Sequence, residues 1–238
     1  MVSAEGLVID WATMPTYNTV MSVAVGVGLL LVVWLGRSLL RDPHGVVVEG
    51  WSLAFGVLGL ILTTTGLHMT LTWPLAAGGF PFDNIVFGET SLAFGVLLVF
   101  ASFYLWTRAR AALEREDAVG RLMAVARPVS VFVLAMGLAL VAIAVAGISY
   151  RLFAAPAEEP ISGTFADHPL VEAIFMSGLI GLVGIGAILF PFGLRATAGA
   201  ATVRRVVGVV WALTGIAFTL FGAMNFFTHI GLIVHTMG

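Results

Sequence analysis

Six long apolar segments decide what this chain can fold into. Each is long enough to cross the roughly 30 Å hydrocarbon core of a bilayer as a helix of about 20 residues. Because backbone N–H and C=O groups find no water in that core, the segments are expected to be α-helical. The sequence therefore predicts an all-α polytopic transmembrane bundle, a single domain over residues 1–238. The expected spans are residues 17–40, 47–73, 84–107, 128–153, 169–194 and 206–229, the last with room to continue to residue 234.

Arginine sets the expected orientation of these helices. All eleven basic residues are Arg, and all but Arg151 fall in alternate connections between the spans. Since positive residues gather on the cytoplasmic side, these connections should face the cytoplasm and both termini the outside. The three connections carry Arg37 and Arg41; Arg108, Arg110, Arg115, Arg121 and Arg127; and Arg195, Arg204 and Arg205.

Composition narrows the classes of function. The chain is 60% hydrophobic and 10% charged, whereas about a quarter of the residues of a soluble domain are charged. The bilayer is therefore its expected partner, and no basic surface is left for nucleic acid. The absence of Cys excludes disulfides, Cys-ligated clusters and thiol catalysis, and the absence of Lys excludes a retinal Schiff base. A bound metal would need His, Asp or Glu ligands.

Four ionisable side chains from four predicted helices are expected at one depth near the outer surface. His68 lies five residues before Trp73, about 7 Å below that surface at 1.5 Å per residue. Glu89 and Glu172 lie at a similar depth on descending helices, and His229 approaches the same surface from below. Ionisable groups inside a membrane are costly and usually functional.

The leading hypothesis from these residues is a metal centre. His68, Glu89, Glu172 and His229, with His168 one turn before Glu172, form a ligand set for Zn, Fe, Cu or Mn. Such an ion would activate water against a lipid-soluble substrate, with Glu89 or Glu172 as the catalytic base, or would cycle between oxidation states. We therefore expect a metal-dependent membrane hydrolase or oxidoreductase. A variant places a b-type haem between His68 and His229 as axial ligands.

Neighbouring residues extend this predicted layer. Asn225 lies one turn before His229, where it could orient the imidazole, and Thr64 lies one turn before His68. Asp83 is expected on the rim above. The spacing contains no diagnostic metal motif such as His-Glu-x-x-His. The prediction depends on shared depth alone.

Two other classes of function stay open. The same His and Glu residues could form a proton or cation pathway of a channel or transporter, although the cytoplasmic half offers few polar residues to continue it. The chain could instead be an accessory subunit without chemistry, bound to an oligomeric or membrane-complex partner through its Gly- and Ala-rich helices. Both Glu89 and Glu172 lie in first helical turns, where the helix dipole alone favours a carboxylate.

One stretch carries a family resemblance. Thr72-Trp73-Pro74-Leu75, followed by the residues from Phe82 to Glu89, resembles an uncharacterised family of bacterial polytopic membrane proteins, a domain of unknown function. The resemblance implies a multi-pass protein of the bacterial inner (plasma) membrane. It implies no activity and no site residue.

Overall fold

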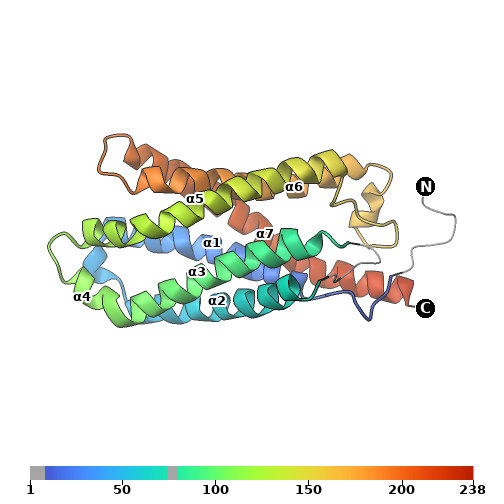
Figure 1. Cartoon of the computed structure of the whole chain (residues 1–238), viewed down its shortest axis with the longest axis horizontal. Coiled ribbons are helices and arrows are strands. Elements are labelled where there is room, and N and C mark those ends of the chain that lie inside the picture. Colours follow the sequence, from blue (N-terminus) through green and yellow to red (C-terminus); the bar gives the residue numbers. More distant parts are fainter. Residues whose placement is uncertain (1–8, 74, 76–79, 238) are drawn as a thin grey trace.

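The computed structural model describes residues 9–73, 75 and 80–237, which form an elongated helical bundle (Figure 1). These residues contain no strand. Six helical spans long and apolar enough to cross a membrane confirm the predicted fold class. The helices are α1 (Asn18–Arg41), α2 (Val48–Leu71), α3 (Thr90–Tyr104), α4 (Arg110–Leu113), α5 (Ala118–Tyr150), α6 (Pro169–Gly193) and α7 (Ala200–Thr236). The shorter elements are the 3₁₀ turns η1 (Pro43–Gly45) and η4 (Ser162–Phe165) and the π-helical segments η2 (Asn84–Glu89) and η3 (Leu105–Ala109). The π-helical segments continue α3 and α4 into one span, Asn84–Leu113.

Two helices are longer than the apolar pattern predicts. The fourth span was expected to start at Pro128, but α5 begins at Ala118, where the Asp117 carboxylate accepts the backbone N–H of Gly120 at 3.0 Å. The 37 residues of α7 give a helix of about 55 Å, so α7 extends beyond the hydrocarbon core. Polar residues continue both helices outside the membrane, where an apolar pattern gives no signal.

Three helix pairs pack closely through glycine. A Cβ added to Gly26 of α1 would lie 2.6 Å from the carbonyl oxygen of Gly215 on α7, and one added to Gly137 of α5 would lie 2.7 Å from that of Gly184 on α6. Gly95 of α3 approaches the backbone of α2 as closely. Small residues allow this approach and give the van der Waals contact that holds helices together in lipid. The bundle is thus built from the pairs α1–α7, α2–α3 and α5–α6.

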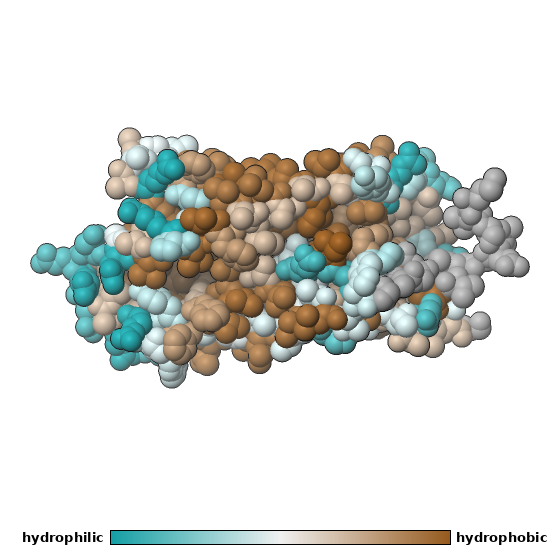
Figure 2. Space-filling view, viewed as in Figure 1, coloured by the Kyte–Doolittle hydropathy of each residue, from teal (hydrophilic) through white to brown (hydrophobic). Residues whose placement is uncertain are grey.

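These three pairs surround a hollow of about 1420 Å³. It is open on one side, because α3 and α5 contact each other very little although both line it. The lining side chains Phe100 of α3 and Val129 of α5 are 68% and 47% exposed. Figure 2 shows this face of the molecule, which is mainly hydrophobic across the middle, apart from one hydrophilic patch, and hydrophilic toward the two ends. The hollow therefore opens toward the lipid between α3 and α5.

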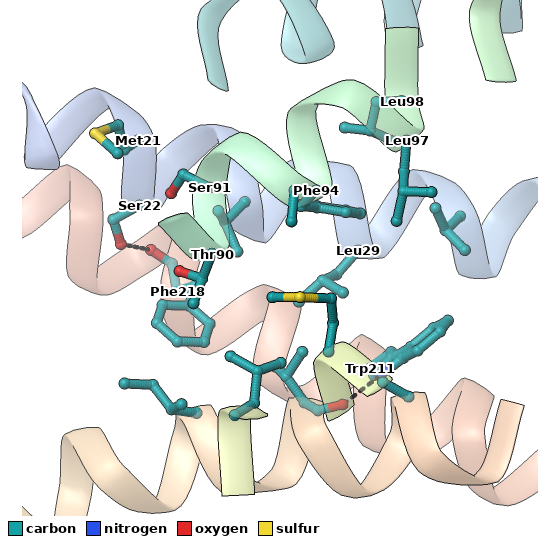
Figure 3. Close-up of a pocket in the computed structure, with 18 of the residues that line it drawn as sticks. Met21, Ser22, Leu29, Thr90, Ser91, Phe94, Leu97, Leu98, Trp211 and Phe218 are labelled. Carbon is teal, nitrogen blue, oxygen red and sulfur yellow. Dashed lines mark hydrogen bonds between the residues drawn. The ribbon is translucent and has the colours of Figure 1, made fainter. Parts of the chain in front are cut away.

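The middle of the hollow is apolar. Leu29 of α1, Phe94 of α3 and Phe218 of α7 lie around it in Figure 3. Trp211 also lines it, and its indole N–H donates to the carbonyl of Val183 at 3.2 Å. Its polar atom is thereby satisfied, so the ring presents an apolar surface.

The two ends of the hollow differ in charge. Arg37, Arg204 and Arg205 line one of them, which we call the arginine end. At the opposite end α1 begins and α7 finishes (Figure 1). We call this the polar end, because it is lined by Asp83, Glu159, Glu172, Asn225 and His229.

Candidate functional site

The connection between α5 and α6, residues 151–168, covers the polar end. Within it the backbone N–H of Glu159 donates to the carbonyl of Pro156 at 3.0 Å, and that of Gly163 donates to the carbonyl of Glu159 at 2.8 Å. Pro160 packs so closely on Gly231 of α7 that a Cβ there would lie 2.3 Å from the proline ring. The connection is therefore a folded cover on the end of α7.

A strained turn sets the position of Glu159 in this cover. Ile161 has φ 67 and ψ −66, and the backbone N–H of Ser162 donates to the carbonyl of Pro160 at 2.8 Å. This is a γ-turn of the rare positive-φ type, centred on a β-branched residue. Such a conformation costs on the order of 1–3 kcal/mol and persists where the surroundings enforce it. Glu159 and Ser162, on either side of this turn, both line the hollow.

Glu159 faces His229 of α7. Its Oε1 atom lies 3.9 Å from Nε2 of His229, and its side chain is 12% exposed. Burial raises the pKa of Glu159; the neighbouring Thr228 hydroxyl opposes this rise and the Glu172 carboxylate adds to it. Since a buried charge is costly without a partner, the carboxyl stays protonated to higher pH than an exposed glutamate.

Glu172 connects the cover to α6. It lies in the first turn of this helix, and its carboxylate accepts the backbone N–H of Ala155. The side chain of Ser162 lies beside the same carboxylate. Glu172 therefore has the helix-terminal role that the dipole argument favours, and it also lines the hollow.

Asn225 contributes an unsatisfied polar group. It lies one turn before His229 on α7, lines the hollow, and is 9% exposed. Its Oδ1 atom has no hydrogen-bond partner among the described residues. A buried amide without a partner costs about 1–3 kcal/mol, so a ligand that donates a hydrogen bond to Oδ1 would offset this cost.

Asp83 is the most deeply buried of the carboxyls that line the polar end. It is 5% exposed, and burial raises its pKa to about 7. Within the described part of the chain, its carboxyl has no hydrogen bond or ion pair. It lies next to Phe82, whose ring contacts Phe153 in the cover. Asp83 was expected on the rim above the predicted layer, and it lies buried in the lining of the hollow.

The structure separates the residues of the predicted metal centre. Glu172 and His229 line the polar end, whereas His68, Glu89 and His168 are exposed and do not line the hollow. His68 pairs through Nδ1 with the hydroxyl of Tyr17 at 2.6 Å. Among the residues that the structure describes, no three His, Asp or Glu side chains lie close enough to hold a metal ion.

A family model described as a protein of unknown function, DUF981, matches residues 14–231, which include five of the six spans completely and most of α7. The chain belongs to the DUF981 family. This confirms the resemblance seen in segments two and three. No curated protein and no solved structure matches the chain.

Sequence reasoning missed Glu159, which the structure places at the centre of the polar end of this DUF981 protein. Glu159 lies in a loop outside the predicted spans, and only the folding of the cover brings it to His229. The signal in the sequence was weak: a Glu-Glu-Pro run in a connection whose single Arg, Arg151, lies at its start. Asn225 was noticed only as a partner of His229.

The polar end of the DUF981 hollow is rich in hydrogen-bond acceptors. It has the carboxyls of Asp83, Glu159 and Glu172, the amides of Asn18 and Asn225 and the imidazole of His229, and within the described residues no Arg side chain lines this end. In a low-dielectric site, hydrogen bonds to such groups are stronger than in water. The arrangement can hold a small polar group beside a long apolar chamber.

Proposed function

We propose that this protein binds a lipid-soluble amphiphile inside the membrane. The amphiphile enters from the bilayer between α3 and α5, and its apolar part fills the hollow while its head reaches the polar end. The main support for this proposal is that an apolar chamber open toward lipid ends at buried polar groups without partners among the described residues, the carboxyl of Asp83 and the amide oxygen of Asn225. The proposed location is the bacterial inner membrane with both termini outside, which the Arg distribution supports.

The shape of the hollow supports an amphiphile rather than an ion. Its volume of about 1420 Å³ exceeds the 300–1,000 Å³ of usual small-molecule pockets. Leu29, Phe94 and Phe218 line its middle, whereas an ion pathway needs polar groups to replace the hydration shell along its length. A channel or transporter of ions is therefore less well supported.

A metal-dependent reaction is also less well supported. It needs at least three converging ligands, and Glu172 and His229 of the predicted set are not joined by His68, Glu89 or His168 in the hollow. Binding of an amphiphile needs only the chamber and its polar end. We therefore propose binding of an amphiphile without a catalytic step.

Selectivity in such a site arises mainly from the head. A lipid chain is as apolar an environment as the hollow, so moving from bilayer to hollow gains little hydrophobic free energy. Hydrogen bonds from the head to Asp83, Glu159 and Asn225 do favour binding, because the bilayer core offers the head no hydrogen-bond partner. The polar end thus determines which amphiphile is retained.

Filling the chamber tests this function. Leu97 of α3 lines the hollow, whereas Leu60 of α2 is 62% exposed and does not. Leu97→Trp should lower the binding of a fluorescent long-chain amphiphile in nanodiscs by roughly tenfold, the effect of losing about 1.4 kcal/mol. Leu60→Trp, the matched control, should leave binding unchanged. Equal binding by both variants would show that the amphiphile occupies the outer surface of the bundle.

A further inference from the structure

The polar end also indicates what kind of head it takes. We propose that the amphiphile carries a protonated amine, which binds among Glu159, Glu172, Asp83 and Asn225. This inference rests on the proposed function and adds the chemical class of the ligand.

Two deeply buried groups point to a ligand at this end. Asn225 is 9% exposed and its Oδ1 atom has no partner, so an acceptor is left unsatisfied beside the hollow. Asp83 is 5% exposed, lines the hollow and has no partner among the described residues. Both would accept a hydrogen bond from an N–H group. An ammonium, with three donors and no acceptor, matches such a set.

Charge complementarity favours a cation over an anion. The carboxyls of Glu159 and Glu172 are close enough for the negative charge of one to affect the other. The imidazole of His229 lies on the other side of this contact, with Nε2 3.9 Å from Oε1 of Glu159. A cation between the carboxylates offsets their repulsion and the cost of burying them. A phosphate would add negative charge, and among the residues that the structure describes the Arg side chains in the lining belong to the arginine end. A phosphate-bearing lipid is therefore directed to the arginine end or excluded.

The cover holds the carboxyls of the polar end in fixed positions. Glu172 holds the backbone of Ala155, and the strained turn at Ile161 fixes Glu159. The carboxyls are therefore positioned before a ligand arrives, and binding requires little ordering of side chains. An ammonium head can then be recognised by groups already in place.

Three photoreactive probes test the head group. They are an alkyl amine, an alkyl alcohol and an alkyl monophosphate of equal chain length, each with a diazirine next to the head, in phosphatidylcholine nanodiscs. The amine should crosslink to the cover and to α7 around residues 225–232, and unlabelled amine should compete at least roughly tenfold better than the alcohol or the phosphate. Equal crosslinking of the phosphate at the polar end would overturn the amine proposal.

Variants make the test specific to the carboxyl. Glu159→Gln should reduce amine crosslinking at the polar end by roughly tenfold, and Glu159→Asp should restore part of it. Glu158→Gln is the matched control, since Glu158 does not line the hollow. If all three probes bind equally well at the polar end, the head-group inference fails while the proposed function stands. If none of them enters the hollow, the proposed function fails as well.

Discussion

Glu159 and His229 meet at the polar end of the hollow, with Oε1 of one 3.9 Å from Nε2 of the other. Glu159 belongs to the α5–α6 connection and His229 to the last turns of α7. Their contact holds the cover against α7 at one end of the chamber formed by the three glycine-packed helix pairs. The proposed binding site depends on this contact, because it brings Glu159 to the other polar groups at that end.

The buried carboxyl of Asp83 should make stability depend on pH. Its pKa is about 7 in the folded protein against an ordinary value of 3.8, so the folded state binds the proton more tightly than the unfolded state. The contribution of the protonated Asp83 carboxyl to the free energy of unfolding is therefore fully present below about pH 4 and is lost as pH rises through 7. Asp83→Asn should remove this loss, which amounts to at most about 4 kcal/mol, as measured by thermal unfolding in detergent at several pH values. The exposed Asp167→Asn is the control; a wild type whose stability does not fall over this range would contradict the assignment.

Binding of the proposed amine should strengthen as pH rises from about 5 to about 8, where an alkyl amine stays protonated. The groups that face it are Asp83, Glu159, Glu172 and His229. Burial raises the pKa of Asp83 and of Glu159, so at acid pH these carboxyls are neutral and attract the ammonium less. Titrating amine affinity in nanodiscs measures this; an affinity that falls with rising pH would refute the charge argument.

Replacing the two histidines should separate the binding site from the predicted metal centre. His229→Ala removes a side chain from the polar end and should weaken amphiphile binding by roughly tenfold. His68→Ala removes the bond to Tyr17 outside the hollow and should leave binding unchanged. Parallel loss of binding and of a stoichiometric metal in both variants, by elemental analysis, would support the metal centre instead.

The glycine contacts should be essential for stability. A Cβ at Gly26 would lie 2.6 Å from the carbonyl oxygen of Gly215, whereas one at Gly36 on the same helix would meet nothing within 4 Å. Gly26→Ala should destabilise the bundle by about 1–3 kcal/mol through overpacking. Gly36→Ala should be neutral or stabilise by up to about 1 kcal/mol, since alanine favours the helix. Thermal unfolding of both variants checks this, and equal melting temperatures would contradict the packing.

The spans could be predicted from the sequence because their lengths and apolar composition are dictated by the bilayer. Four of the six predicted starts lie within one residue of the helices, and the misses at Pro128 and residue 206 arose where helices continue outside the core. The shared depth expected for the ionisable side chains followed from the same span lengths. Glu172 and His229, both expected at one depth, line the same end of the hollow.

The direction in which side chains face could not be predicted from depth. Gly66 of α2 packs on the backbone of Leu92 and Gly88, and position 68 lies about 200° further around the helix. The contact between α2 and α3 thus turns His68 away from that seam. Glu159 could not be placed at all, because its position depends on how the α5–α6 connection folds. Helix rotation and loop structure are set by tertiary packing, and the lengths and hydropathy of the spans carry no information about that packing.

The most direct test of the central claim is where a bound amphiphile lies. A long-chain probe with a diazirine in the middle of its chain, photolysed in nanodiscs, can be located by peptide mass spectrometry. An amphiphile bound in the hollow should crosslink to Leu29, Met176 and Trp211, which line it from three different helices. Crosslinks confined to lipid-facing residues such as Leu53, Leu60 and Leu213 would contradict this location.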